Sequence, residues 1–194
     1  MDADFAVELG PDADCLEIPW GPTDGAIRYY NLRTQPELLL NVEEATRNHE
    51  LGEFLSGTNT DHSIVETAKC DTWLSKEITE AEQIYGVPWK FGSYIDLIFV
   101  EAAPRLSFGR HEELAQKLTV LLGRAPQVSA AAEFVIRRCY YHPDGDPDVS
   151  DHGFCITFYL HGYGDDEDEA RQRWAIGLKL VQNALLQLSA AYRR

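Results

Sequence analysis

The sequence lacks the short motifs that identify common enzyme classes. No G-x-S-x-G nucleophile elbow, phosphate-binding glycine loop, H-E-x-x-H zinc motif or dinucleotide-binding fingerprint occurs among its 194 residues. These absences lower the odds of the corresponding enzymes without excluding an enzyme of another kind. They leave the fold, and the residues that it brings together, as the guide to function.

Long apolar runs and paired cysteine motifs are also absent. No apolar run of about 18 residues occurs, which predicts no transmembrane helix. The amino terminus lacks the basic and apolar regions of a secretion signal, so a cytoplasmic location is expected. No C-x-x-C spacing occurs, so free and partly buried thiols are expected, and no cofactor or metal ion is predicted. If Cys139 and Cys155 face one another, a bridge or a shared metal is the alternative.

Basic side chains are few, and they are unevenly distributed along the chain. The net charge is −15, and residues 1–61 contain 13 acidic and 3 basic side chains against 19 and 14 in the rest of the chain. Such a negative field disfavours nucleic acid and anionic membranes, because neither finds a counter-charge. It is compatible with a protein partner, particularly a basic one, with a homo-oligomer, and with a protein that has no charged partner.

What the sequence does contain is a pattern of strands and amphipathic helices. Period-two alternation and apolar runs predict strands over 63–73, 94–100, 132–142 and 153–162. Spacings of three and four predict helices over 35–56, 109–122 and 166–191.

These elements predict an α+β fold. We expect an antiparallel sheet of about four or more strands with helices on one face, a ferredoxin-like strand-helix-strand-strand-helix core and a long C-terminal helix. Strand 94–100 is placed between 153–162 and 63–73. A single domain, 1–194, is expected, with an acidic N-terminal extension over 1–62 that carries one helix and an α+β core over 63–194.

The pairing of strands 132–142 and 153–162 follows from their apolar positions. Phe154, Ile156, Phe158 and Leu160 share one face of their strand, and this face must meet the apolar face of the partner. Pairing Phe134 with Leu160 and Ile136 with Phe158 satisfies this condition. The same register pairs Glu133 with His161, Arg137 with Thr157 and Cys139 with Cys155, although a shift of two residues satisfies the condition equally.

Polar groups from all four strands then share the face that points away from the helices. In strand 63–73, Thr67, Lys69 and Asp71 are expected on this face, with Ile64, Ala68 and Cys70 on the other. The candidate ligand-binding residues are Lys69, Asp71, Asp96, Glu133, Arg137, Tyr159 and His161. A histidine with two carboxylates can perform acid–base chemistry or hold a divalent metal. The alternative is a solvated sheet face whose cross-strand pairs contribute about 0.2–1 kcal/mol each.

The acidic segment 144–151 resembles an oxygen-rich calcium loop. It lacks the terminal bidentate glutamate of an EF-hand, which favours a solvated hairpin tip instead.

Two functions fit these features. The charge asymmetry and the absence of catalytic motifs favour a protein-binding or regulatory module that presents the polar sheet face or the acidic N-terminal segment to a partner. The alternative is a small-molecule-binding domain or enzyme that uses Asp96, Glu133 and His161. An enclosed polar pocket would favour the second function, and a flat exposed face the first.

Overall fold

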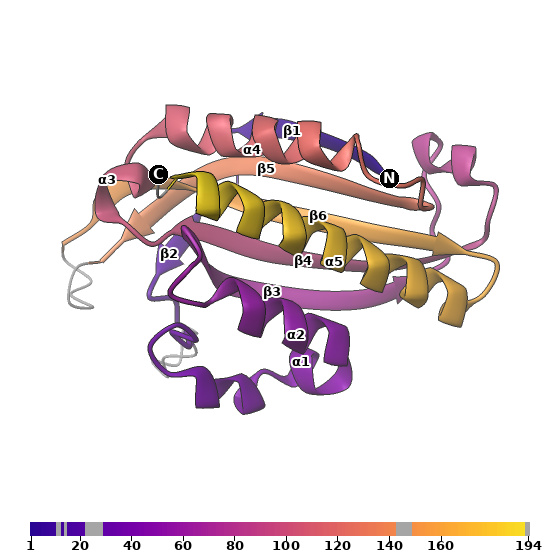
Figure 1. Ribbon diagram of the computed structural model, residues 1–194, viewed down its shortest axis with the longest axis horizontal. Helices are drawn as coiled ribbons and strands as arrows, with labels where there is room; N and C mark the ends of the chain where they lie inside the picture. Colours follow the sequence, from indigo (N-terminus) through magenta and orange to yellow (C-terminus); the bar gives the residue numbers. More distant parts are fainter. Residues whose placement is uncertain (11–12, 14, 22–28, 143–148, 193–194) are drawn as a thin grey trace.

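The computed structural model describes residues 1–10, 13, 15–21, 29–142 and 149–192. Its described part is built on a six-stranded sheet in the order β1-β5-β6-β4-β3, with the short β2 also paired to β5 (Figure 1). The strands are β1 (Asp2–Glu8), β2 (Leu16–Ile18), β3 (Val65–Ser75), β4 (Trp89–Phe99), β5 (Ala130–Tyr141) and β6 (Asp151–Gly164). The pairs β5–β6, β6–β4 and β4–β3 are antiparallel, whereas β1 and β2 pair with β5 in parallel.

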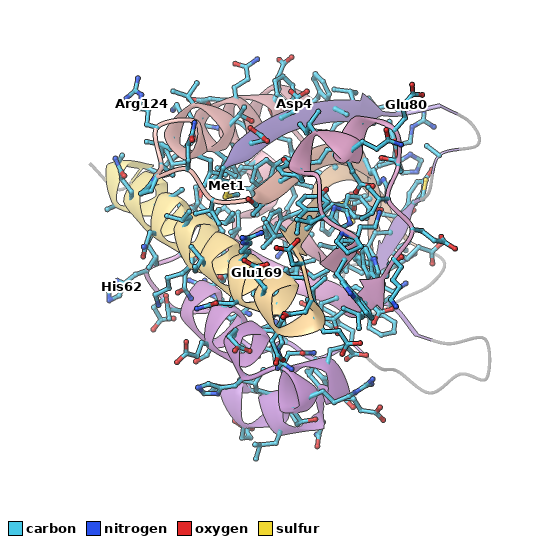
Figure 2. All side chains as sticks on the ribbon, turned by 90° about the vertical axis from the view of Figure 1, so that its right-hand side faces the viewer. Met1, Asp4, His62, Glu80, Arg124 and Glu169 are labelled. Atoms are coloured by element: carbon cyan, nitrogen blue, oxygen red, sulfur yellow. The ribbon has the colours of Figure 1, made fainter. Side chains whose placement is uncertain are left out.

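The helices that cover the sheet lie on one of its faces. The helical elements are η1 (Pro36–Asn41), α1 (Glu43–Arg47), α2 (His49–Thr58), η2 (Ala81–Tyr85), α3 (Ala102–Arg105), α4 (Phe108–Leu122) and α5 (Glu167–Tyr192). Helix α4 packs on β1 and β5, α5 on β6 and β4, and α2 beside them on β3. In Figure 2, α5 lies on one side of the sheet and Glu80, just before η2, lies on the other. We call the face opposite α4 and α5 the outer face.

The main core lies between the sheet and these helices. Phe134, Phe158 and Leu160 project from β5 and β6 into it and are fully buried with Trp174 of α5. The Trp174 indole N–H donates a hydrogen bond of 2.8 Å to Ser93 Oγ on β4, so its polar atom is satisfied inside the core. Gly162 of β6 permits this approach, because a methyl group there would overlap the backbone of Ala170 and Trp174.

The predicted α+β class, the predominantly antiparallel sheet and the long C-terminal helix are confirmed. The four predicted strands are also neighbours in the expected order, now β5-β6-β4-β3. The ferredoxin-like arrangement is not confirmed, because β1 and β2 extend the sheet with parallel pairs. Both of these strands come from residues 1–62, which therefore contribute to the sheet itself. No helix in the described ranges is long and apolar enough to span a membrane.

The predicted register of β5 and β6 was wrong by two residues. Phe134 pairs with Phe158 instead of Leu160, and Ile136 pairs with Ile156 instead of Phe158. As a result Glu133 lies opposite Tyr159, Arg137 opposite Cys155 and Cys139 opposite Gly153. A shift of two residues keeps every side chain on its own face, so the alternation could not distinguish the two registers.

The single helix expected over 35–56 is divided into η1, α1 and α2. The backbone is extended at Val42 and at Asn48, where the helical turns are interrupted. Asn48 Nδ2 donates hydrogen bonds of 3.1 Å to Thr72 Oγ1 of β3 and to the carbonyl of Glu44. The break thus ties this segment to the sheet edge, and α2 packs on the same face as α5.

Candidate functional site

The outer face of the sheet is covered at one end by a second, smaller apolar cluster. Its buried members are Ile18, Ala68, Ile98, Cys139, Tyr141 and Cys155, with Leu16, Trp20 and Tyr29 packed against them. The short strand β2 brings Leu16 and Ile18 onto this end of β5. The sheet is therefore closed to solvent where β4 ends and β6 begins.

The opposite end of the outer face is covered by η2 through a set of paired polar groups. Lys90 Nζ donates to both carboxylate oxygens of Glu82 at 3.0 Å, and the Tyr163 hydroxyl donates to Glu82 Oε1 at 2.9 Å. Tyr85 stacks on Tyr163 with ring centroids 4.0 Å apart, and its hydroxyl donates to Asp2. We call Glu82, Lys90, Tyr163, Tyr85 and Asp2 the η2 clamp.

The Glu82 carboxyl shows how completely the η2 clamp is paired. Burial alone would raise its pKa, but hydrogen bonds from Thr79, Lys90 and Tyr163 outweigh burial and lower the pKa to about 2. The carboxylate stays ionised because each neighbour stabilises its charge. This arrangement holds η2 on the sheet and leaves no free ligand-binding group on Glu82.

Between the two covered ends lies a half-open cavity of about 320 Å³. It is lined by Cys15, Leu16, Lys69, Tyr94, Asp96, Arg137, Cys155, Thr157 and Tyr159. These residues come from β2, β3, β4, β5 and β6 and from the segment before β2. The volume is at the lower end of the range of about 300–1,000 Å³ typical of small-molecule sites.

A β-bulge brings Lys69 to this cavity. Thr67 pairs with Leu97 and Cys70 pairs with Ile95, so Ala68 and Lys69 together lie opposite the single residue Asp96. Such a bulge redirects side chains and is often found next to active sites. It also overturns part of the predicted face of β3, because Thr67 lies on the helix side, where Asn59 Nδ2 donates to its hydroxyl at 2.7 Å. Ala68 instead joins the outer apolar cluster.

Asp96 is a buried carboxylate on the lining of the cavity. Only 6% of the residue is exposed, and Thr157, its partner on β6, donates a hydrogen bond from Oγ1 to Asp96 Oδ1 at 2.6 Å. Burying a carboxylate costs free energy unless other groups compensate, so such residues are found where a structural network or a function requires them.

Arg137 provides a positive charge at the opposite wall. Its Nε and Nη2 donate to Glu8 Oε2 at 3.1 and 2.7 Å, and its Nη1 donates to the Tyr159 hydroxyl at 3.1 Å. Burial would lower the pKa of Arg137, but the bonds to Glu8 and Tyr159 outweigh burial and raise it. The guanidinium is thus held in place and always charged.

Tyr94 completes the wall on β4. Burial, followed by the charges of Asp96 and Asp71, raises its pKa above the ordinary value of a phenol. The hydroxyl therefore stays protonated at neutral pH and can donate a hydrogen bond. Tyr159 lies beside it, with ring centroids 6.2 Å apart, so two phenols line one side of the cavity.

A larger hollow of about 560 Å³ adjoins the cavity on the other side of Lys69. Lys69 and Tyr94 line both spaces, while Trp20, Glu44 and Asp71 line only the larger hollow. Trp20 also fixes the bulge, because its indole N–H donates to the Ala68 carbonyl at 2.9 Å. The two hollows meet at Lys69, whose Nζ lies 5.7 Å from the centre of the Trp20 ring.

The cavity unites four of the seven residues predicted for the site. Lys69, Asp96, Arg137 and Tyr159 line it, and Asp71 lines the adjoining hollow. Glu133 is exposed on β5 and lines neither space.

His161 also lies away from the cavity, beside the η2 clamp. It contacts the edge of Trp73, with ring centroids 5.7 Å apart, and burial and the charge of Lys90 lower its pKa. The structure therefore does not bring His161 and Glu133 together with Asp96.

Several residues of the cavity were not on the predicted list. Tyr94 lies two residues before Asp96 on the same strand, and Thr157 two residues before Tyr159, so the period of two was a sufficient signal for both. Cys15 and Leu16 gave no such signal, because β2 is only three residues long and its parallel pairing with β5 has no sequence signature.

The described residues provide no metal site and no disulfide. They contain no group of three or more His, Cys, Asp or Glu side chains placed to hold a metal ion. Cys139 and Cys155 are free and buried, and the neighbouring Cys139, together with burial, raises the pKa of the Cys155 thiol. The calcium-like segment 144–151 falls largely outside the described residues, which omit 143–148.

No family model, no curated protein and no solved structure matches this chain.

Proposed function

We propose that the protein binds a small polar molecule in the cavity over Asp96. The observation that carries the proposal is the bulge in β3, which sets Lys69 across from a buried carboxylate at a hollow of the outer face between the apolar cluster and the η2 clamp. Without the bulge, the pairing between β3 and β4 would be regular. With an apolar residue in place of Asp96, the smaller apolar cluster of the outer face would extend to this position.

The groups around the cavity support recognition of a ligand with both donors and acceptors. Lys69 and Arg137 are cations, Asp96 is a hydrogen-bond acceptor when ionised, and the phenols of Tyr94 and Tyr159 can donate. Few polar groups converging on a concave surface are what small-molecule sites use to set orientation and specificity.

The protein-binding module stays a second proposal, on different evidence. Its support is the negative charge of residues 1–61 and the half-open form of the cavity, which a protruding side chain of a partner could also enter. The two proposals differ in the size of the molecule that fills the cavity.

A thermal-shift screen against a library of small polar compounds tests the first proposal. We expect compounds that raise the melting temperature of the wild type and of Glu133→Gln, an exposed carboxylate on the same face, but not that of Asp96→Asn. Asparagine keeps the shape of Asp96 and an oxygen that accepts from Thr157, so this variant should fold. If no compound stabilises the wild type, or if the same compounds stabilise Asp96→Asn equally, the cavity is not the binding site.

A further inference from the structure

We infer that the free edge of β1 binds an extended segment of a partner protein, in which basic and apolar residues alternate, as a further strand of the sheet. This surface is separate from the cavity over Asp96, so the inference does not rest on the small-molecule ligand proposed there. It follows from three features of β1: an open backbone edge, different side chains on its two faces, and its negative charge.

The two edges of the sheet differ in how far other residues close them. At the β3 edge, Asn59 Oδ1 accepts a hydrogen bond from the Thr67 N–H at 3.0 Å. The Trp20 indole N–H donates to the Ala68 carbonyl at 2.9 Å. These backbone groups of β3 are therefore unavailable to a further strand, as is usual where a protein protects an edge from pairing.

β1 forms the opposite edge of the sheet and is closed much less (Figure 1). Outside its ladder with β5, the backbone of Asp2–Glu8 forms a single hydrogen bond among the described residues, from the Phe5 N–H to the carboxylate of its neighbour Asp4 at 2.7 Å. Every second N–H and C=O of an edge strand points away from the sheet, where an extended peptide can pair with it. The seven residues of β1 are long enough for such a pairing.

The two faces of β1 determine which side chains a docked strand needs. Its apolar residues lie in register with core residues of β5 and share the face covered by α4: Ala3, Phe5 and Val7. Its acidic residues share the outer face: Asp2, Asp4 and Glu8. Val7 is nevertheless 45% exposed, so an apolar residue of a docked strand would bury surface that the chain itself leaves open.

The outer face of β1 favours a basic residue in the partner. Asp4 lies in register with Glu133 of β5, and both are exposed and form no ion pair among the described residues. Like charges on neighbouring strands are unfavourable, and a lysine or arginine on the next strand would offset them. Glu8, by contrast, is already paired with Arg137, which leaves Asp4 as the acid of β1 that a partner would recognise.

A second copy of the chain fits this edge poorly. An antiparallel pairing of β1 with itself would bring Asp2 of one copy toward Glu8 of the other, and each copy has a net charge of −15. The same charge attracts a basic segment at long range. A strand with lysine or arginine at every second position and apolar residues between them would match both faces of β1.

Fluorescence anisotropy with a labelled, capped peptide tests the inference. The peptide alternates lysine and valine over seven residues, the length of β1. We expect it to bind, and we expect a peptide with proline in place of each valine to bind at least about tenfold more weakly, because proline has no N–H to donate to a ladder. Equal binding of the two peptides would mean that charge alone attracts them. No binding of the lysine–valine peptide would mean that the acids of β1 only protect the edge, and either result would overturn the inference.

Two charge-reversal variants form the matched test of position. Asp4→Lys should weaken binding of the lysine–valine peptide at least about fivefold. Asp168→Lys makes the same change of charge at an exposed position of α5 and should change the affinity by less than about twofold. Equal effects of the two variants would contradict the assignment to β1.

Hydrogen exchange of the full chain measures the pairing itself. The peptide should slow the exchange of backbone amides of β1 and leave those of β3 unchanged. If β1 exchange in the free chain slows as the protein concentration is raised, a second copy occupies the edge and the inference is wrong. Because the peptide does not occupy the cavity, a failed thermal-shift screen leaves this inference standing, and a failed peptide experiment leaves the proposed function standing.

Discussion

The outer face of the sheet contains two polar regions that differ in how their charges are satisfied. In the η2 clamp, Glu82 and Lys90 form a bidentate ion pair with only 14% and 12% of their side chains exposed, and Tyr163 adds a further bond. Around the cavity, Arg137 is paired with Glu8 and Asp96 accepts a hydrogen bond from Thr157, but Lys69 is exposed without an ion pair in the described part of the chain.

This difference separates a structural role from a binding role. The η2 clamp has a segment of chain packed over it, and its groups serve one another. The cavity has charged groups but a free volume in front of them. Charged residues on a sheet face therefore indicate a binding site only where an open volume adjoins them. Variants of residues in the two regions test whether this distinction holds here.

The largest effect on stability is expected in the η2 clamp. Lys90→Met leaves the Glu82 carboxylate without its cation, and we expect a loss of about 2–3 kcal/mol in the free energy of unfolding. The double variant Lys90→Met/Glu82→Gln should recover part of this loss, because the orphaned charge is removed. Chemical denaturation measures both, and a loss below about 0.5 kcal/mol for Lys90→Met would contradict the assigned role.

The second-largest effect on stability is expected at acid pH, through Glu82. The folded pKa of Glu82 is about 2 against 4.5 for the free side chain. Its stabilising contribution is therefore complete above pH 4.5 and is lost as the pH falls toward 2. Between pH 5 and pH 2 the wild type should lose about 1–2 kcal/mol more than Glu82→Gln, after allowance for solvent screening. Denaturation at several pH values measures the difference, and equal losses would show that Glu82 gains nothing from its partners.

A smaller effect on stability is expected at the floor of the cavity. Asp96→Asn keeps an acceptor for the Thr157 hydroxyl, so we expect the free energy of unfolding to change by less than about 1 kcal/mol. Ligand-induced stabilisation should nevertheless be lost. If chemical denaturation shows that Asp96→Asn loses several kcal/mol in the free energy of unfolding, Asp96 has a structural role like that of the η2 clamp residues.

The smallest effect is expected at Lys69. Because it is exposed and forms no ion pair among the described residues, Lys69→Met should change the free energy of unfolding by less than about 0.5 kcal/mol. Its effect should appear in binding alone. A larger loss would mean that Lys69 stabilises the bulge, and would weaken the distinction between the two regions.

The sequence predicts much of the fold because its patterns are strong where the core is. The alternation of Phe154, Ile156, Phe158 and Leu160 identified the face beneath α5, and the four central strands occur in the expected order. The strands β1 and β2 were not predicted, because their partners on β5 lie more than 100 positions away and β2 is only three residues long.

The site was predicted in part for the same reason. The alternation of side chains along each strand placed Asp96, Arg137 and Tyr159 on the outer face, and the structure brings all three to the cavity. The position along the strand was not predictable, since a two-residue shift leaves parity unchanged and moves Glu133 away from His161. The bulge at Ala68 and Lys69 also has no local sequence signal, although it determines which side chains of β3 face the ligand site.

Amide chemical-shift mapping of the labelled full chain, titrated with the best-binding compound, tests the binding site most directly. We predict shifts at Ala68, Lys69 and Asp96 and at Thr157 on β6, with the amides of Glu82 and Lys90 unchanged. Shifts confined to the η2 clamp or to the helices, with none at the bulge, would contradict the assignment of this cavity.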